Sequence, residues 1–237
     1  DVVLAPRKGR PGLTPRLEHT SEERPLVAQI WGTDPESYAR AAARLVELGF
    51  DGIDINMGCP VRKIRRKGAC SALIRQPALA AELIAAAREG AERAWRQRTP
   101  PPRMGGACES GGVRRAPGAN GDPPAPRYPI SVKTRIGFHA PDTEEWVGHL
   151  LSCDLDAITV HGRVANQESE GEVAWSEIAR AASLAQEMGV STAVLGNGDV
   201  TSRDEIQEKA VRFGLDGVMV GRGVFADPYL FATDGRA

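Results

Sequence analysis

Cys59 lies on a turn between a glycine and a proline, directly after a predicted buried strand over residues 52–56. That strand alternates apolar side chains with two polar ones, Asp54 and Asn56, which therefore share one face. Because Gly58 and Pro60 end the strand, the thiol is expected at the mouth of a site and not inside a core. A thiol held there is available for chemistry. The alternative is that Cys59 packs as a small buried hydrophobe, the commoner fate of a free cysteine.

Basic side chains stand at the carboxyl ends of two further predicted strands. Lys133 points to the inward side, where a lone ammonium is costly, so a negative or electron-rich partner is expected. An internal salt bridge to Asp54 is the alternative. His161 is followed by Gly162-Arg163. At the edge of a sheet this setting favours contact with a ligand over a satisfied core histidine.

Two glycine-rich turns follow the last two predicted strands, Asn197-Gly198-Asp199 and Gly221-Arg222-Gly223. Backbone amides freed by glycine bind phosphate at such positions, and Arg222 adds a cation. A plain turn is the alternative for the second motif taken alone. The pairing of both motifs favours a phosphate site.

Strands and helices alternate along the chain. Strands are predicted over 26–31, 52–56, 130–135, 157–161, 192–197 and 217–221, and helices over about 34–48, 77–95, 143–152, 175–188 and 203–213. Asp34 and Pro35 begin the first helix, Gly49 ends it, and Thr143 is the expected cap of the third. Alternation predicts a parallel sheet.

Polar residues end nearly every predicted strand, namely Gln29, Asn56, Lys133, His161 and Asn197. A (β/α)8 barrel of the TIM type builds its site from all its strand ends, whereas a doubly wound sheet uses only a few, so the barrel is favoured. Only six strands are recognised, and the barrel is expected to be incomplete.

The composition limits the classes of function. Thirty Lys and Arg against 31 Asp and Glu give a net charge of −1, so any basic surface is local. No apolar run approaches the roughly 18 residues of a membrane span, and no signal-peptide core is found, which predicts no membrane partner and a cytoplasmic protein. Four cysteines without ligand spacing predict reduced thiols and no metal site.

The domain prediction has three parts. Residues 1–24 are an irregular lead-in, and residues 25–237 form the barrel domain. Residues 96–128, rich in proline, glycine and arginine, form a disordered insertion within it, because such a segment cannot bury a core.

The motifs together resemble the tRNA-dihydrouridine synthases, flavoenzymes with an FMN-binding barrel. They are Asn-Met-Gly-Cys-Pro-Val-Arg-Lys, Ser-Val-Lys-Thr-Arg, Val-His-Gly-Arg, Gly-Asn-Gly-Asp and Val-Gly-Arg-Gly, in that order. The resemblance covers about Leu26 to Phe231. It implies that FMN is held by Gln29, Lys133, His161, Asn197, Gly198, Asp199, Gly221 and Arg222, and that Cys59 is the proton donor. The family's first two strands and its carboxyl-terminal helical domain have no recognisable counterpart here, although Leu4-Ala5-Pro6 faintly echoes the first strand.

The implied reaction is reduction of a uridine in tRNA to 5,6-dihydrouridine, with NADPH as the reductant of the flavin. The base must leave its stack to reach such a pocket. A basic run after the thiol is expected to meet the RNA backbone, with a solvated loop as the alternative: Arg62, Lys63, Arg65, Arg66 and Lys67. Two other functions stay open. One is a flavin enzyme for a small molecule, of the dihydroorotate-dehydrogenase type, and the other is a truncated, non-catalytic fragment with residual flavin or RNA binding.

Overall fold

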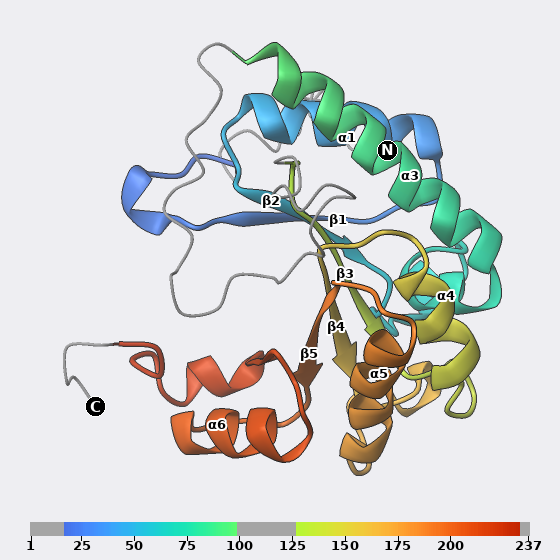
Figure 1. Ribbon diagram of the computed structural model, residues 1–237, viewed down its shortest axis with the longest axis vertical. Coiled ribbons are helices and arrows are strands. Elements are labelled where there is room, and N and C mark those ends of the chain that lie inside the picture. The colour runs from blue at the N-terminus through green and yellow to red at the C-terminus, as the bar shows by residue number, and fades with distance from the viewer. Residues whose placement is uncertain (1–16, 99–126, 233–237) are drawn as a thin grey trace.

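A computed structural model describes residues 17–98 and 127–232 of the chain (Figure 1). The described residues form one parallel six-stranded sheet in the order β1-β2-β3-β4-β5-β6. Its strands are β1 (Val27–Ile30), β2 (Gly52–Asn56), β3 (Ile130–Arg135), β4 (Ala157–His161), β5 (Ala193–Asn197) and β6 (Gly217–Met219). The strand order follows the chain order without reversal, as in a barrel, whereas a doubly wound sheet reverses at a switch point. Within the described residues β1 and β6 are edges, so the sheet is not closed.

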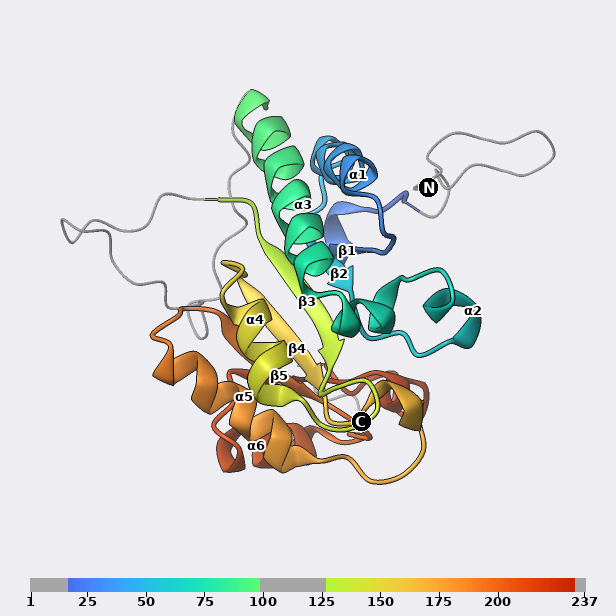
Figure 2. The ribbon, with the colours of Figure 1, turned by 90° about the vertical axis from the view of Figure 1, so that its right-hand side faces the viewer.

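Helices follow the strands and cover the outside of the sheet. They are α1 (Pro35–Glu47), α2 (Arg62–Arg65), α3 (Pro77–Gln97), α4 (Gly148–Leu151), α5 (Trp175–Glu187) and α6 (Arg203–Arg212). Figure 2 shows α1 and α3 packed side by side over the amino-terminal strands, with α4 and α5 beside the later ones. Between them lies an apolar core in which Ile53, Ile130 and Ile158 are fully buried. No helix in the described part of the chain is long and apolar enough to cross a membrane.

The first helix begins and ends as its sequence predicts. The Asp34 carboxylate accepts a hydrogen bond from the Ser37 amide at 2.9 Å, and Pro35 takes the first helical position. Gly49 follows the helix with φ at +90°, a conformation that suits glycine. Further along, Gly90 lets α3 approach α1, since a Cβ there would lie 2.0 Å from the Ala39 carbonyl oxygen.

The predicted cap at Thr143 is wrong. Thr143 is the first residue of a π-helical turn (Thr143–Val147) that leads into α4, and its hydroxyl donates to the Glu177 carboxylate on α5 at 2.5 Å. The hydroxyl therefore ties two neighbouring helices together instead of satisfying the amides of its own helix.

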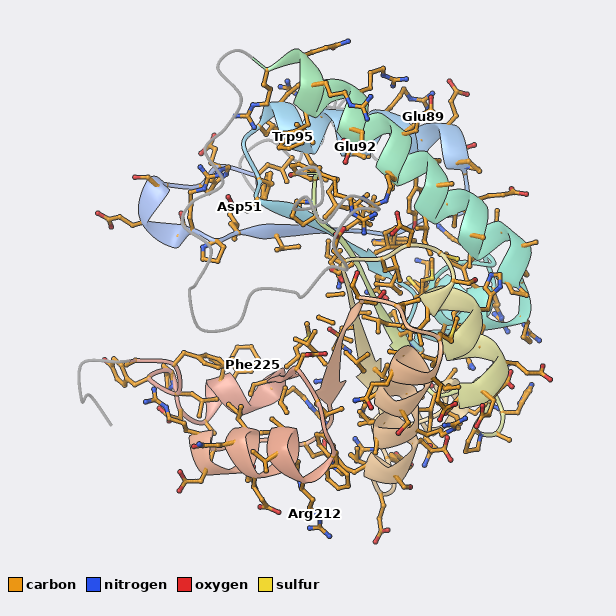
Figure 3. The ribbon with its side chains drawn as sticks, viewed as in Figure 1. Asp51, Glu89, Glu92, Trp95, Arg212 and Phe225 are labelled. Carbon is orange, nitrogen blue, oxygen red and sulfur yellow. The ribbon has the colours of Figure 1, made fainter. Side chains whose placement is uncertain are left out.

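An aspartate repeats at the start of every second strand. Asp51, Asp156 and Asp216 directly precede β2, β4 and β6. Each accepts a hydrogen bond from an amide at the start of the strand before it: Leu26 to Asp51 at 2.7 Å, Ile130 to Asp156 at 2.9 Å and Val194 to Asp216 at 2.8 Å. Asp51 is labelled in Figure 3. These carboxylates fix the register of three strand pairs at the end of the sheet opposite the strand carboxyl ends.

The ends of the predicted insertion are ordered. Arg96 and Gln97 belong to α3, and Tyr128 is buried, with its hydroxyl donating to the Phe50 carbonyl at 2.6 Å. The boundaries 96 and 128 are therefore wrong by two to three residues. Residues 99–126 lie outside the described residues, as do residues 1–16 with the Leu4-Ala5-Pro6 segment. Of the lead-in, residues 17–24 are described and form one short turn, Ser21–Glu23.

Candidate active site

The turn that carries Cys59 is held from below by Asn56, the last residue of β2. The Asn56 side-chain oxygen accepts from the amides of Gly58 and Cys59 at 3.1 and 3.0 Å. The Cys59 carbonyl accepts from the Ser71 hydroxyl at 2.8 Å. The Cys59 side chain itself is half-buried, so the thiol is fixed at the carboxyl edge of the sheet and still reachable.

Cys70 is the cysteine that behaves as a buried hydrophobe. It is 1% exposed, and burial raises the pKa of its thiol to about 12. It lies near the Cys59 turn, because Ser71 bonds to Cys59 and the Cys59 charge contributes to the Cys70 shift. Of the two neighbouring thiols, only Cys59 is placed to react.

A polar network connects β1, β2 and β3 beneath this turn. The Gln29 side-chain nitrogen donates to one Asp54 carboxylate oxygen at 2.7 Å, and the Ser131 hydroxyl donates to the other at 2.7 Å. The Asn56 side-chain nitrogen donates to the Gln29 side-chain oxygen at 2.9 Å. Gln29 and Asn56, both predicted at strand ends, therefore meet. Burial raises the pKa of the Asp54 carboxyl, against the lowering effect of these hydrogen bonds.

Lys133 lies next to this network without joining it. Within the described residues it forms no ion pair with Asp54, which is the alternative that the sequence left open. Burial, reinforced by the nearby Arg135 guanidinium, lowers the pKa of the Lys133 ammonium to about 8. The ammonium thus lies in a poorly hydrated environment in which the negative charge nearby does not compensate its own.

His161 is neutral at physiological pH. Burial and the cations Arg135, Lys133 and Arg163 lower the pKa of its imidazole to about 3. The Arg163 guanidinium lies 3.4 Å from the His161 Nε2 atom. Because arginine only donates, Nε2 accepts and the ring proton is assigned to Nδ1.

Two buried arginines complete the basic cluster. Arg135 is 5% exposed and donates to the carbonyls of Gly58 and Val164 at 2.8 and 3.1 Å. Burial and the Arg163 charge lower the pKa of Arg135 to about 10. Neither arginine was predicted to have a role from the sequence, although Arg135 stands two residues after Lys133 and so shares its face of β3.

Arg163 is 3% exposed and links the ends of β4 and β5. It forms a salt bridge with Asp199 and donates to the Gly171 carbonyl at 3.0 Å. Asp199 also accepts from Arg222 at 3.3 Å, and the bond from Arg163 holds the pKa of Asp199 below its usual range. The carboxylate therefore orients the cation of the second glycine turn.

The predicted phosphate motifs are adjacent. The Asn197 side chain donates to the Met219 carbonyl at 2.8 Å and so joins β5 to β6. Gly198 has φ at +148°, and a Cβ there would lie 2.6 Å from the Val173 side chain, so only glycine fits. Gly221 is exposed, and a Cβ there would meet no atom within 4 Å. The second turn is open to a ligand.

The basic run after Cys59 divides into two groups. Arg62, Lys63, Arg66 and Lys67 are exposed, and within the described residues none has a carboxylate partner. Arg65 is half-buried instead: it donates to the Asn166 side chain at 2.7 Å, and its guanidinium lies 5.4 Å from the centre of the Phe138 ring. Arg65 thus ties the loop after β2 to the loops after β3 and β4.

Nothing in the described part of the chain gathers three or more metal-ligating side chains. The site is built from a fixed thiol, a neutral imidazole and an excess of buried cations at the carboxyl edge of a parallel sheet. This arrangement defines an enzyme-like barrel site for an electron-rich or anionic ligand.

The family is shown by comparison with known proteins. The model of the dihydrouridine synthase (Dus) family matches residues 7–97 and 124–236, and the chain belongs to that family. A probable tRNA-dihydrouridine synthase 2 of Bacillus subtilis is 34% identical over 227 residues, which cover 95% of this chain and 59% of the relative. A probable tRNA-dihydrouridine synthase of Staphylococcus aureus is 32% identical over 222 residues, covering 93% and 57%. The chain therefore spans somewhat more than half the length of these relatives.

Among solved structures, a dihydroorotate dehydrogenase (DHODH) of Eimeria tenella in complex with ferulenol aligns with a TM-score of 0.57. The alignment covers 91% of this chain and 60% of that one at 17% identity, so it shows the fold alone. The fold is that of a parallel β/α barrel.

Proposed function

We propose that this chain reduces uridine in tRNA to 5,6-dihydrouridine with FMN as cofactor and NADPH as reductant. The observation that carries the proposal is the Cys59 turn, fixed by Asn56 beside the partly buried Lys133 and the buried Arg135 and Arg163. Membership of the Dus family supports it. The proposed reaction takes place in the cytoplasm, where tRNA is used in translation.

The basic cluster fits FMN. Besides burial, neighbouring cations lower the pKa of Lys133 (through Arg135), of Arg135 (through Arg163) and of His161 (through Arg135, Lys133 and Arg163), because Asp54 and Asp199 do not balance the positive charge here. An electron-rich ring edge and a phosphate would relieve this excess. The residues that would hold FMN are Gln29, Lys133, His161, Asn197, Gly198, Asp199, Gly221 and Arg222. Asp199 would act through Arg222, since a carboxylate and a phosphate repel each other.

Bound FMN, once reduced, would supply the hydride that C6 of the uracil receives. Cys59 would protonate C5, a role that needs a donor held over one face of the base. A half-buried thiol on a turn that is fixed by three hydrogen bonds, two to Cys59 and one to Gly58, meets that need. The cations around it would bind the electron-rich edge of the flavin ring and so help to orient it.

The RNA backbone would lie over α2. Arg62, Lys63, Arg66 and Lys67 are exposed and have no carboxylate partner in the described ranges, whereas Arg40 and Arg44 on α1 are paired with acids. Cations without acidic neighbours are free to replace the counterions of phosphates.

These exposed cations also favour RNA over the small substrate of a dihydroorotate-dehydrogenase-type enzyme, because a small molecule with a single carboxylate does not need several exposed cations outside the pocket. The likeness to that dehydrogenase speaks for the fold alone. The remaining alternative, a non-catalytic fragment, is supported by the edges that β1 and β6 form within the described residues, and the experiment decides it.

The experiment compares the chain with Cys59→Ala in two steps: NADPH oxidation by the flavin-loaded protein, and dihydrouridine formed in an unmodified tRNA transcript, counted by mass spectrometry. We expect Cys59→Ala to keep FMN binding and NADPH oxidation. Dihydrouridine formation should fall about a hundredfold or more, the effect of a lost general acid. Cys153→Ala, a half-buried thiol after α4, is the matched control and should change neither step.

Undiminished dihydrouridine formation in Cys59→Ala would mean that the thiol is structural. A parent chain that binds FMN and forms no dihydrouridine would be the non-catalytic fragment. One that instead oxidises dihydroorotate would belong with the small-molecule enzymes.

A further inference from the structure

Asp54 is a buried carboxylate to which the proposed reaction gives no direct part. It is 7% exposed, and it lies in the middle of the sheet between Gln29 on β1 and Ser131 on β3. Among the described residues it forms no salt bridge, and the nearby Lys133 charge offsets only part of the effect by which burial raises its pKa. A carboxylate in this setting is costly, so its placement requires a reason.

The hydrogen bonds from Asp54 lead to the reactive thiol in three steps. Gln29 donates to Asp54 at 2.7 Å, Asn56 donates to the Gln29 oxygen at 2.9 Å, and the Asn56 oxygen accepts from the Gly58 and Cys59 amides at 3.1 and 3.0 Å. We call this the Asp54 relay: Asp54, Gln29, Asn56 and the two amides of the turn.

Each amide side chain in the relay has a donating end and an accepting end, so the partner of one end fixes what the other end offers. A carboxylate only accepts, and it therefore determines that the Gln29 nitrogen faces Asp54. The Gln29 oxygen must then face Asn56, and the Asn56 oxygen must face the turn. The turn amides only donate, so they favour the same orientation from the other end, and Asp54 adds a fixed acceptor that keeps Gln29 in contact with Asn56. In the reverse orientation the Asn56 nitrogen would face two N–H groups, and both bonds would be lost.

We propose that Asp54 is a positioning residue that holds Cys59 in place through Gln29 and Asn56. The proposal rests on the proposed function, in which Cys59 is the proton donor. It gives this buried side chain a role, since one Asp54 oxygen anchors Gln29 and Gln29 in turn anchors Asn56.

Three substitutions separate this role from general stability. Asp54→Leu removes the acceptor and leaves no room for a bridging water. Gln29→Met interrupts the relay in its middle with a side chain of similar length. Asp54→Asn keeps an oxygen for Gln29 and a nitrogen that can donate to the Ser131 hydroxyl, so the relay survives without the charge. Ser131→Ala is the matched control, since Ser131 bonds to Asp54 but lies outside the relay.

Two measurements report on the turn and need neither flavin nor RNA. Hydrogen exchange of the Gly58 and Cys59 amides reports the bonds to Asn56, and the rate of Cys59 alkylation by iodoacetamide, relative to Cys153, reports the fixed thiol. We expect Asp54→Leu and Gln29→Met to raise both about tenfold, the effect of one to two lost hydrogen bonds. Asp54→Asn and Ser131→Ala should stay within about twofold of the parent chain.

Exchange in β4 and alkylation of Cys153 should not change, because a general loosening would raise these too. If Asp54→Leu loosens the whole chain, the comparison of turn protection between Gln29→Met and Asp54→Asn alone decides whether the relay exists. Unchanged protection of the turn in Gln29→Met, or a loss of protection in Asp54→Asn as large as in Gln29→Met, would overturn the relay. Because these outcomes do not depend on catalysis, a chain that makes no dihydrouridine can still confirm or refute it.

Discussion

At the scale of single residues, the partly buried cations of the site lower the stability of the fold when no ligand is bound. Lys133 is the clearest case, since burial lowers its pKa from the ordinary value of 10.5 to about 8. A cation whose folded pKa is depressed destabilises the fold at neutral pH, where it is charged in both states but buried in only one. Between about pH 8 and 10.5 the unfolded chain binds the extra proton, so the free energy of unfolding rises with pH in that window.

We therefore expect Lys133→Met to raise the stability of the flavin-free chain at pH 7 by about 1–3 kcal/mol while weakening FMN binding. Its advantage should shrink as the pH rises from about 8 to 10.5, where Lys133 loses its proton in the folded state. Urea unfolding at several pH values measures the difference. Lys63→Met, at an exposed lysine, is the control and should change stability little. A destabilised Lys133→Met at pH 7 would contradict the assignment of Lys133 as a ligand-binding residue.

The cations after Cys59 give a second prediction at this scale. Exposed Lys63 should contact a phosphate, so Lys63→Ala should reduce the slope of log affinity against log salt by about 0.7–0.9 for a tRNA transcript. Arg65 is tied to Asn166 and Phe138, so Arg65→Ala should leave that slope unchanged and lower the thermal midpoint instead. Arg40→Ala, which removes a cation already paired with Glu36, is the control. Equal slopes for Lys63→Ala and the parent chain would refute the contact.

The sequence was informative where a residue's role depends on its own strand. Alternation alone placed Cys59 at a strand end and Lys133 on the inward face, and the structure confirms both positions. Arg163 was missed because its partner Asp199 is 36 residues away, and Thr143 was misassigned because its hydroxyl bonds to Glu177, 34 residues on. Long-range pairs of this kind leave no periodic trace in a sequence.

At the scale of elements, the aspartate before every second strand is a repeat that the sequence does display. It reads Phe-Asp-Gly-Ile, Leu-Asp-Ala-Ile and Leu-Asp-Gly-Val at residues 50–53, 155–158 and 215–218. Each carboxylate accepts a hydrogen bond from a backbone amide at the start of the preceding strand and so links consecutive β/α units. The pattern fits a fold built from repeated units, in which each unit fixes the register of the one before it.

Asp216 allows the cleanest test, because its only described side-chain bond is the one from the Val194 amide at 2.8 Å. Asp216→Ala leaves that amide without its acceptor, and we expect a loss of about 1–2 kcal/mol in the free energy of unfolding. Asp216→Asn keeps an oxygen at the same place and should lose less than half of that. Urea midpoints at unchanged slope provide the measurement. Equal midpoints for all three chains would show that the bond from the Val194 amide to Asp216 adds nothing to stability.

At the scale of the whole molecule, the chain follows the family with one interruption. The family model matches up to residue 97 and again from 124, and residues 98–123 are unmatched. Both flanks are fastened to the barrel independently. Arg98 donates to the Val46 carbonyl at 2.9 Å, and Arg127 pairs with Asp154 and Asp156. Neither flank therefore depends on the connection between them for its position.

We expect that residues 100–125 can be replaced by a short Gly-Ser linker without loss of fold. The flanking contacts remain, and a loop of less than half the length lowers the closure entropy by only about 1 kcal/mol, in favour of the folded state. The thermal midpoint should stay within a few degrees or rise slightly. Arg127→Ala in the parent chain is the comparison: it breaks the pairs with Asp154 and Asp156 and should lower the midpoint more than the replacement does. A replacement that lowers the midpoint by more than Arg127→Ala would mean that residues 100–125 pack on the barrel and belong to its fold.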